Sequence, residues 1–226
     1  MNSIGEKLSI IQGDIQCFSP WPDRVRIIAV SKRVSISQMR MVAEAGITAF
    51  GENRIQEALV KFSQESFPGI ERHFIGSLQS NKVQDLLNHF HWLHSLDRMK
   101  TARLIAKEKS SLQILIQVNT GGETSKGGIA PDDVESFVDQ LKETLPDLHI
   151  KGLMTMAPLT GDTGRIRRSF IRLRELRDKL KKTKTGTFSF DELSMGMTGD
   201  YKIALEEGAT MIRIGQGLFG PRQERL

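Results

Sequence analysis

Short segments that are apolar on both faces recur along the 226-residue chain, and each is followed by residues with the spacing of an amphipathic helix. Segments of the first kind are typical of buried parallel strands, which need a helical crossover between them. The clearest, at residues 112–119, reads LQILIQVN. We expect eight such strands, at residues 26–30, 47–53, 73–76, 91–95, 112–119, 149–154, 190–195 and 210–214.

Helical patterns lie between the strands and once before the first strand. They are predicted at 7–17, 37–45, 55–62, 81–88, 96–109, from 131, 165–182 and 201–207. No change of composition marks a linker, so the prediction is one (β/α)8 barrel domain over residues 1–226. An open doubly wound sheet is the alternative, but eight strands in this length favour closure. Little chain remains for a long eighth helix, so we expect the leading helix to help close the ring.

Composition limits the classes of function. Hydrophobic residues make up 38% and charged residues 26%, which allows a large core, and the net charge is +5. A basic balance permits contact with nucleic acid or anionic lipid without establishing it. The basic residues concentrate in the predicted helix at 165–182, whose apolar stripe is typical of a solvated barrel exterior, so no nucleic-acid partner is expected.

The sequence also bears on location. Cys17 is the single cysteine, so no disulfide forms within the chain, as is usual in a reducing cytosol. The N-terminus lacks the pattern of a signal peptide, and no run of 18 apolar residues is present. We therefore expect a cytoplasmic protein without a membrane span.

Candidate site residues are those at the carboxyl ends of the strands, which face one mouth in a barrel. Lys32 closely follows the strand at 26–30, where a desolvated amine can attack a carbonyl. Taken alone, Lys32 is more simply interpreted as an exposed charge. The other strand ends present Asn53, Ser77, Asn119, Met154, Ser194 and Arg213. This set predicts an anionic ligand that carries a carbonyl group.

Two loops are candidates for holding a phosphate. Residues 194–200, SMGMTGD, combine hydroxyls and glycines before a predicted helix, although an ordinary loop capped by Thr198 or Asp200 is an equal alternative. After the last strand, Gly215 permits close approach of a ligand to the backbone. Arg213 stands between two isoleucines of a buried strand, so we expect it to point inward.

Two further features were weighed as sites. The glycine-rich stretch 121–128 lacks the GxxxxGK[ST] spacing of a nucleotide loop and is interpreted as a lid at the mouth. The five histidines show no ligand spacing, and His91 and His94 are expected on opposite faces of a strand. A metal site is therefore not expected.

Several stretches together resemble the YggS/PROSC family, the pyridoxal phosphate (PLP) homeostasis proteins. Their fold is similar to the N-terminal barrel domain of alanine racemase, of fold type III among PLP proteins. The resemblance rests on AVSK at 29–32, FGENRIQE at 50–57, HFIGSLQSNK at 73–82, QVN at 117–119, KGG at 126–128, GLMTM at 152–156, LSMGMT at 193–198, RIG at 213–215 and LFG at 218–220.

The resemblance implies pyridoxal 5'-phosphate as cofactor, held as a Schiff base, or aldimine, on Lys32. It implies that Arg213 faces the pyridine nitrogen, where a cation disfavours protonation and makes the ring a poorer electron sink. The remaining implied contacts are Ser194 and the backbone of Gly215 and Gln216 to the phosphate, with Asn53 and Met154 near the ring.

Two departures from the family pattern affect these expectations. The family often continues after the lysine with threonine, lysine and proline, whereas this chain has RVS at 33–35. Gln216 stands where the family usually has threonine or serine, so a hydroxyl contact to the phosphate is lost. Cofactor affinity is the property most affected.

The predicted function is intracellular PLP homeostasis, in which the protein holds the cofactor covalently without turnover and passes it to PLP-dependent apo-enzymes. The alternative is a PLP-dependent amino-acid racemase, which needs an acid or base on each face of the substrate. The single tyrosine, Tyr201, lies in a predicted helix and is a poor second group. An aldolase that uses Lys151 as nucleophile is a third hypothesis.

Overall fold

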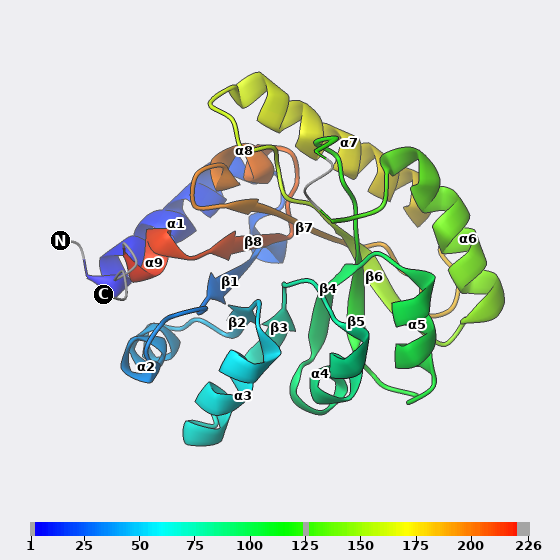
Figure 1. Cartoon of the computed structure of the whole chain (residues 1–226). Helices are drawn as coiled ribbons and strands as arrows, with labels where there is room; N and C mark the ends of the chain where they lie inside the picture. The colour runs from blue at the N-terminus through cyan, green and yellow to red at the C-terminus, as the bar shows by residue number, and fades with distance from the viewer. Residues whose placement is uncertain (1–2, 124–126, 221–226) are drawn as a thin grey trace.

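A closed parallel barrel forms the centre of the molecule (Figure 1). The structure is a computed structural model and describes residues 3–123 and 127–220, within which each of eight strands pairs in parallel with the next and β8 pairs with β1. The strands are β1 (Arg26–Val30), β2 (Ala49–Glu52), β3 (Glu71–Phe74), β4 (Trp92–Leu96), β5 (Gln113–Gln117), β6 (His149–Met154), β7 (Glu192–Met197) and β8 (Met211–Ile214). The pairing of β1 with β8 confirms the predicted barrel and excludes the open sheet.

Helices surround the barrel (Figure 1). They are α1 (Ile4–Phe18), α2 (Ile36–Glu44), α3 (Ile55–Gln64), α4 (Val83–His89), α5 (Met99–Ala106), α6 (Val134–Thr144), α7 (Thr163–Lys181), α8 (Tyr201–Glu206) and α9 (Gln216–Phe219). The short 3-10 helices η1 (Pro22–Arg24), η2 (Ser80–Lys82) and η3 (Pro131–Asp133) precede β1, α4 and α6.

Some predicted strand boundaries were wrong. β3 spans Glu71–Phe74 rather than 73–76, because Glu71 pairs with Ala49 although it is polar. β7 begins at Glu192 rather than 190, because Phe190 has a left-handed backbone with φ 52°, which a strand does not accommodate. The ends of β3 and β7 are set by strand register and local backbone geometry. Neither can be read from a run of apolar residues.

The leading helix closes the ring, as expected. α9 has only four residues, and α1 packs against both α8 and α9 (Figure 1). The Tyr201 hydroxyl of α8 donates to the Asp14 carboxylate of α1, and Lys202 Nζ lies 3.0 Å from the same carboxylate. At its start, α1 is stabilised by a capping box between Ser3 and Glu6.

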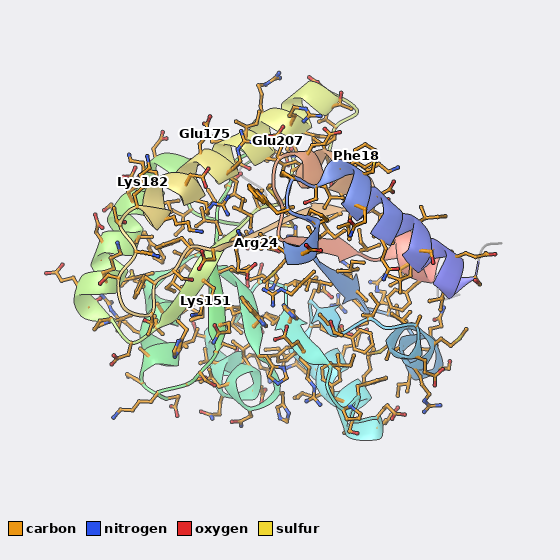
Figure 2. The ribbon with its side chains drawn as sticks, turned by 180° about the vertical axis from the view of Figure 1, so that it is seen from behind. Phe18, Arg24, Lys151, Glu175, Lys182 and Glu207 are labelled. Carbon is orange, nitrogen blue, oxygen red and sulfur yellow. The ribbon has the colours of Figure 1, made fainter. Side chains whose placement is uncertain are left out.

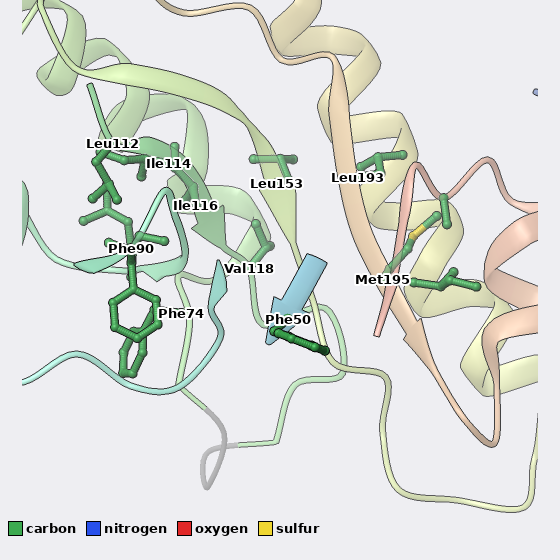
Figure 3. Packing of buried hydrophobic residues seen from close by; sticks show 14 of the residues in the cluster. Phe50, Phe74, Phe90, Leu112, Ile114, Ile116, Val118, Leu153, Leu193 and Met195 are labelled. Carbon is green, nitrogen blue, oxygen red and sulfur yellow. The ribbon is translucent and has the colours of Figure 1, made fainter. Parts of the chain in front are cut away.

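The main hydrophobic core lies between the barrel and its helices (Figure 3). Ile114 and Ile116 of β5 point into it, and so do Leu153 and Leu193 of the following strands. The intervening residues face the barrel interior, because successive side chains of a strand alternate. The interior is smaller and mixed in polarity, and its apolar members include Ile28, Ala49, Trp92, Leu115, Met154 and Met211.

The basic helix α7 lies on the exterior, in agreement with its predicted role (Figure 2). Its Arg167 and Arg174 both bind the carboxylate of Glu207, which follows α8 and is itself buried. Lys179 Nζ lies 2.5 Å from Glu135 of α6. Much of the positive charge of α7 is therefore paired with acids of neighbouring helices. Among the described residues, no helix combines the length and the apolar character needed to cross a lipid bilayer.

Gly152 tests the register between β6 and β7. A Cβ at this position would lie 1.9 Å from the carbonyl oxygen of Glu192, so we expect Gly152→Ala to lower the free energy of unfolding by about 3 kcal/mol or more. Urea denaturation measures the change. Gly161→Ala is the matched control, because nothing lies within 4 Å of its added Cβ. Equal stability of the two variants would contradict the register.

Candidate functional site

Lys32 and Asn53 leave adjacent strands at the same level of the barrel mouth. Val30 is aligned with Gly51 across β1 and β2, and each polar residue follows two positions later. On the other side of β1, a Cβ built on Gly215 lies 3.7 Å from Val30 Cβ. The register thus brings the predicted lysine, asparagine and glycine to one mouth. Lys32 and Asn53 are partly buried.

The turn that carries Lys32 is held by hydrogen bonds on both sides of it. Ser31 Oγ donates to Glu52 Oε1 over 2.8 Å, and the carbonyl oxygen of Ser31 accepts from Lys61 Nζ over 2.7 Å. On the other side, the backbone N–H of Arg33 donates to Glu57. These contacts fix the backbone on either side of Lys32.

Lys61 of α3 is the centre of this arrangement, and the sequence interpretation missed it. Its Nζ lies 2.8 Å from both Glu52 Oε1 and Glu57 Oε1, and the residue is only 8% exposed. Burial raises the pKa of Glu52, although Lys61 opposes that shift. The spacing of Glu57 and Lys61, four residues apart in an amphipathic helix after the FGEN segment, was the available signal.

Arg213 points into the barrel below the mouth, as its isoleucine neighbours predicted. It is 4% exposed, and its Nη1 donates to Ser194 Oγ over 2.7 Å while Nη2 donates to the carbonyl oxygen of Thr155 over 2.8 Å. Burial lowers the pKa of Arg213 to about 10, so the guanidinium remains charged at neutral pH. Met154 pairs in register with Ser194 and is 1% exposed, which places both below the mouth.

Two buried histidines meet behind Arg213, which the sequence interpretation did not foresee. His94 Nδ1 lies 2.9 Å from Ser194 Oγ, and His94 Nε2 lies 2.9 Å from His73 Nδ1. His91 is exposed and His94 is buried, so their expected divergence is confirmed. The available signal in the sequence was that His73 and His94 occupy inward positions on neighbouring strands.

The loops after β7 and β8 meet through Thr198. Its Oγ1 accepts a hydrogen bond from the backbone N–H of Gly217 over 3.2 Å, and a Cβ on Gly217 would approach the Thr198 side chain to 3.0 Å. Gln216 lies between these contacts with its side chain exposed. By contrast, Ser194, predicted to touch a phosphate, has its hydroxyl engaged by Arg213 and His94. Of the hydroxyls in the predicted 194–200 loop, Thr198 is therefore the one that lies against the loop after β8.

The donors at this mouth suit a phosphate-bearing aldehyde. A lysine amine, a buried guanidinium and loop residues with backbone N–H groups occur together, and the glycine backbone leaves space for an anion. Asp200 is the N-cap residue of α8, as the ordinary-loop alternative predicted, and its carboxylate accepts from Met197 N. The N-cap and a phosphate site are compatible in this loop, because the cap uses Asp200 and the phosphate site would use other groups of the loop.

The other predicted features lie elsewhere or are occupied. Lys151 is the extra residue of a β-bulge between Ile150 and Gly152, in the amino half of β6 and away from the mouth (Figure 2). The Asn119 side chain accepts from Gly122 N and donates to Glu123 O, so it shapes its own loop. The predicted lid at 121–128 includes residues 124–126, which are outside the described residues.

Comparisons with known proteins agree with this architecture. The profile of the alanine racemase N-terminal domain matches residues 19–223. The pyridoxal phosphate homeostasis protein of Pseudomonas aeruginosa is 37% identical, with 98% of this chain and 97% of that protein covered. The homologue of Escherichia coli K12 is 33% identical, with 98% of each covered.

Solved structures give the same result. PipY of Synechococcus elongatus with PLP bound superposes with a TM-score of 0.84 at 33% identity and covers 96% of this chain and 100% of its own. Alanine racemase of Clostridium difficile, at 12% identity, superposes with a TM-score of 0.69 over 57% of its length and shares the fold.

Removing Lys61 tests the clamp on the turn around Lys32, which consists of the contacts of Lys61 with Glu52, Glu57 and the Ser31 carbonyl oxygen. We expect Lys61→Met to lower the free energy of unfolding by about 3 to 5 kcal/mol, because Glu52 is left buried without its cation. Adding Glu52→Gln should restore part of that loss in urea denaturation. A single variant as stable as the native protein would contradict the clamp.

The buried histidines predict a pH dependence of stability. Burial lowers the pKa of His73 from 6.5 to about 4, and it also lowers that of His94. Between these pH values the unfolded chain binds protons that the folded protein does not, so the free energy of unfolding falls as pH falls. The loss from His73 approaches about 3 kcal/mol at pH 4.

Urea midpoints at pH 7, 6 and 5 measure this slope. His73→Asn should flatten it, whereas His91→Gln, which removes an exposed ring, is the control. A slope that is equally steep in His73→Asn would assign the effect to other groups.

Proposed function

The chain belongs to the pyridoxal phosphate homeostasis proteins, which share the alanine racemase N-terminal domain, and from this premise we propose that it binds pyridoxal 5'-phosphate with Lys32 as the covalent anchor. The observation that carries the proposal is the convergence of Lys32, Arg213 and Gly215 at one mouth. Lys32 lies far from Arg213 and Gly215 in sequence and comes near them only through the closure of β8 on β1.

Each group at the mouth has a role in binding. PLP supplies an aldehyde for an amine and a ring that withdraws electrons when its nitrogen is protonated. Lys32 Nζ, on its fixed turn, provides the amine. The backbone at Gly215 and Gln216, with the Thr198 hydroxyl, binds the phosphate, and Ser194 acts from below through Arg213. Asn53 and Met154 line the space for the ring.

Arg213 determines how the bound ring behaves. Its guanidinium is charged and cannot accept a proton from the ring nitrogen, so it keeps that nitrogen unprotonated. A ring in that state stabilises a carbanion poorly. The residues at the mouth therefore favour retention of the cofactor over turnover of an amino acid, which agrees with a role in PLP homeostasis and delivery to apo-enzymes.

Tyr201 is not available as the second acid that racemisation requires. The hydroxyl of Tyr201, the single tyrosine of the chain, donates to Asp14 of α1, and burial raises its pKa. It is committed to the contact between α8 and α1. Lys151 likewise lies in the amino half of β6, away from the mouth, and is therefore a poor aldolase nucleophile there.

Borohydride reduction of the PLP-loaded protein tests the anchor. We expect one reduced adduct, located on Lys32 by peptide mapping, and its loss in Lys32→Ala, because the neighbouring Lys61 amine is engaged by Glu52, Glu57 and the Ser31 carbonyl oxygen. Lys151→Ala is the matched control and should keep the adduct. An adduct on Lys151, or none in the native protein, would overturn the assignment. Racemisation of L-alanine that disappears in Lys32→Ala would overturn the absence of turnover.

A further inference from the structure

A row of polar side chains crosses the barrel interior from its base to Arg213. Starting from Arg213, it runs through Ser194 Oγ at 2.7 Å, His94 at 2.9 Å and His73 at 2.9 Å. It ends at Glu71, whose Oε2 lies 3.4 Å from His73 Nε2, close enough for the carboxylate to attract an N–H dipole but outside hydrogen-bond geometry. The five residues come from four strands, β8, β7, β4 and β3, so the row is a property of the closed barrel.

The surroundings exclude alternative partners for the two imidazoles. His73 and His94 are both fully buried. The indole of Trp92 stacks on His73, with ring centroids 5.4 Å apart and an angle of 6° between the planes. The guanidinium of Arg26 also lies over the Trp92 ring, 4.7 Å from its centroid, and pairs with Glu192 over 2.8 Å. Each imidazole nitrogen in the row therefore has one defined neighbour.

The direction of every hydrogen in the row follows from its two ends. Arginine only donates, so Ser194 Oγ accepts from Arg213 and has its own hydrogen free for His94 Nδ1. His94 then carries its proton on Nε2 and donates it to His73 Nδ1. His73 in turn carries its proton on Nε2, which faces the carboxylate of Glu71.

The opposite direction is unfavourable at both ends. With His94 donating from Nδ1, Ser194 Oγ would accept twice and its hydrogen would have no partner in the row. His73 would then present a bare nitrogen lone pair to the Glu71 carboxylate, which repels it. A buried polar group without a partner is costly, so the two ends select one tautomer for each ring.

We propose that His94, His73 and Glu71 are positioning residues that orient the Arg213 guanidinium through Ser194, with the direction of the row set by Glu71. This inference rests on the proposed function, in which Arg213 faces the ring nitrogen of the cofactor. Ser194 and the Thr155 carbonyl oxygen bind different nitrogens of the guanidinium and so fix its plane. Ser194 can serve only while His94 Nδ1 accepts its hydrogen.

The tautomers are measured directly by long-range ¹H–¹⁵N spectra of the full chain, with and without PLP. Both buried rings should be neutral and protonated on Nε2 at pH 7, and His73→Asn and His94→Asn assign the signals. A proton on Nδ1 of His94 would overturn the proposed direction. This readout does not depend on cofactor binding.

Two substitutions of His94 separate orientation from packing. Asparagine places a polar atom near the position of Nδ1 and can still accept from Ser194, whereas glutamine reaches toward Nε2 and fills more of the space. We expect PLP to bind roughly tenfold more weakly to His94→Gln than to the native protein, and His94→Asn to bind close to native. Simple filling of volume predicts the reverse order, and that order would overturn the proposal.

The base of the row offers its own matched pair. Glu71 and Glu192 both contact Arg26, but only Glu71 faces a histidine. Glu71→Leu should alter the tautomer signals of both rings and weaken PLP binding, while Glu192→Leu should leave the tautomers unchanged. Equal effects of the two variants would assign Glu71 a structural role only.

The failure of the proposed function is distinguishable from the failure of this inference. Absence of a borohydride adduct on Lys32 in the native protein removes the cofactor assignment, whereas the ring tautomers still report the direction of the row. Conversely, a native adduct together with unchanged binding in His94→Gln leaves the cofactor assignment intact and removes the positioning role. Where a variant fails to fold by circular dichroism, the native tautomers decide.

Discussion

The pairing of β8 with β1 is the contact on which the site depends. Its register aligns Ile28 with Arg213 and Ala29 with Ile214, and so places the two ends of the barrel sequence side by side. Lys32 leaves the barrel just above this pairing, next to the glycine backbone that follows β8. Closing a ring over such a sequence separation is entropically unfavourable, and burial between barrel and helices offsets that cost. The helix α1 strengthens the closure from outside by packing on α8 and α9.

Placing polar groups inside the barrel has its own cost, and the structure meets it with partners. Arg213, Ser194, His94 and His73 are buried, and each has a hydrogen bond to another interior group. Neutral imidazoles avoid the desolvation of a second cation beside the guanidinium, which is why burial and neighbouring charge lower the pKa of both. The interior is thereby specified by directional contacts, while the outer core relies on apolar packing.

The sequence predicted those features that depend on local pattern. Segments apolar on both faces, with helical spacing between them, were enough for the barrel, and strand-end chemistry selected Lys32 and Arg213 as candidates. The pairing of His73 with His94 depends on which strand positions face each other, and the pairing of Lys61 with Glu52 depends on how α3 lies against β2. Bulges in β4–β5, β5–β6 and β7–β8 shift that register by amounts that no local pattern encodes. Ser194 was predicted at the mouth in contact with a phosphate, whereas its hydroxyl binds Arg213 and His94, and these partners follow only from the three-dimensional alignment of the strands.

The clamp around Lys32 and the row behind Arg213 would hold opposite ends of a bound molecule. In the proposed complex, Lys61 and Glu57 would hold the backbone around Lys32, and hence the point of attachment, while the row behind Arg213 would hold the plane of its guanidinium at the opposite end of the ring. Fixing both ends before binding reduces the entropy that a ligand must lose. It also limits the movement of the ring relative to the amine, which a turnover cycle with successive covalent partners would require. Under the proposed function, a rigid mouth of this kind favours holding one cofactor in one orientation over a turnover cycle.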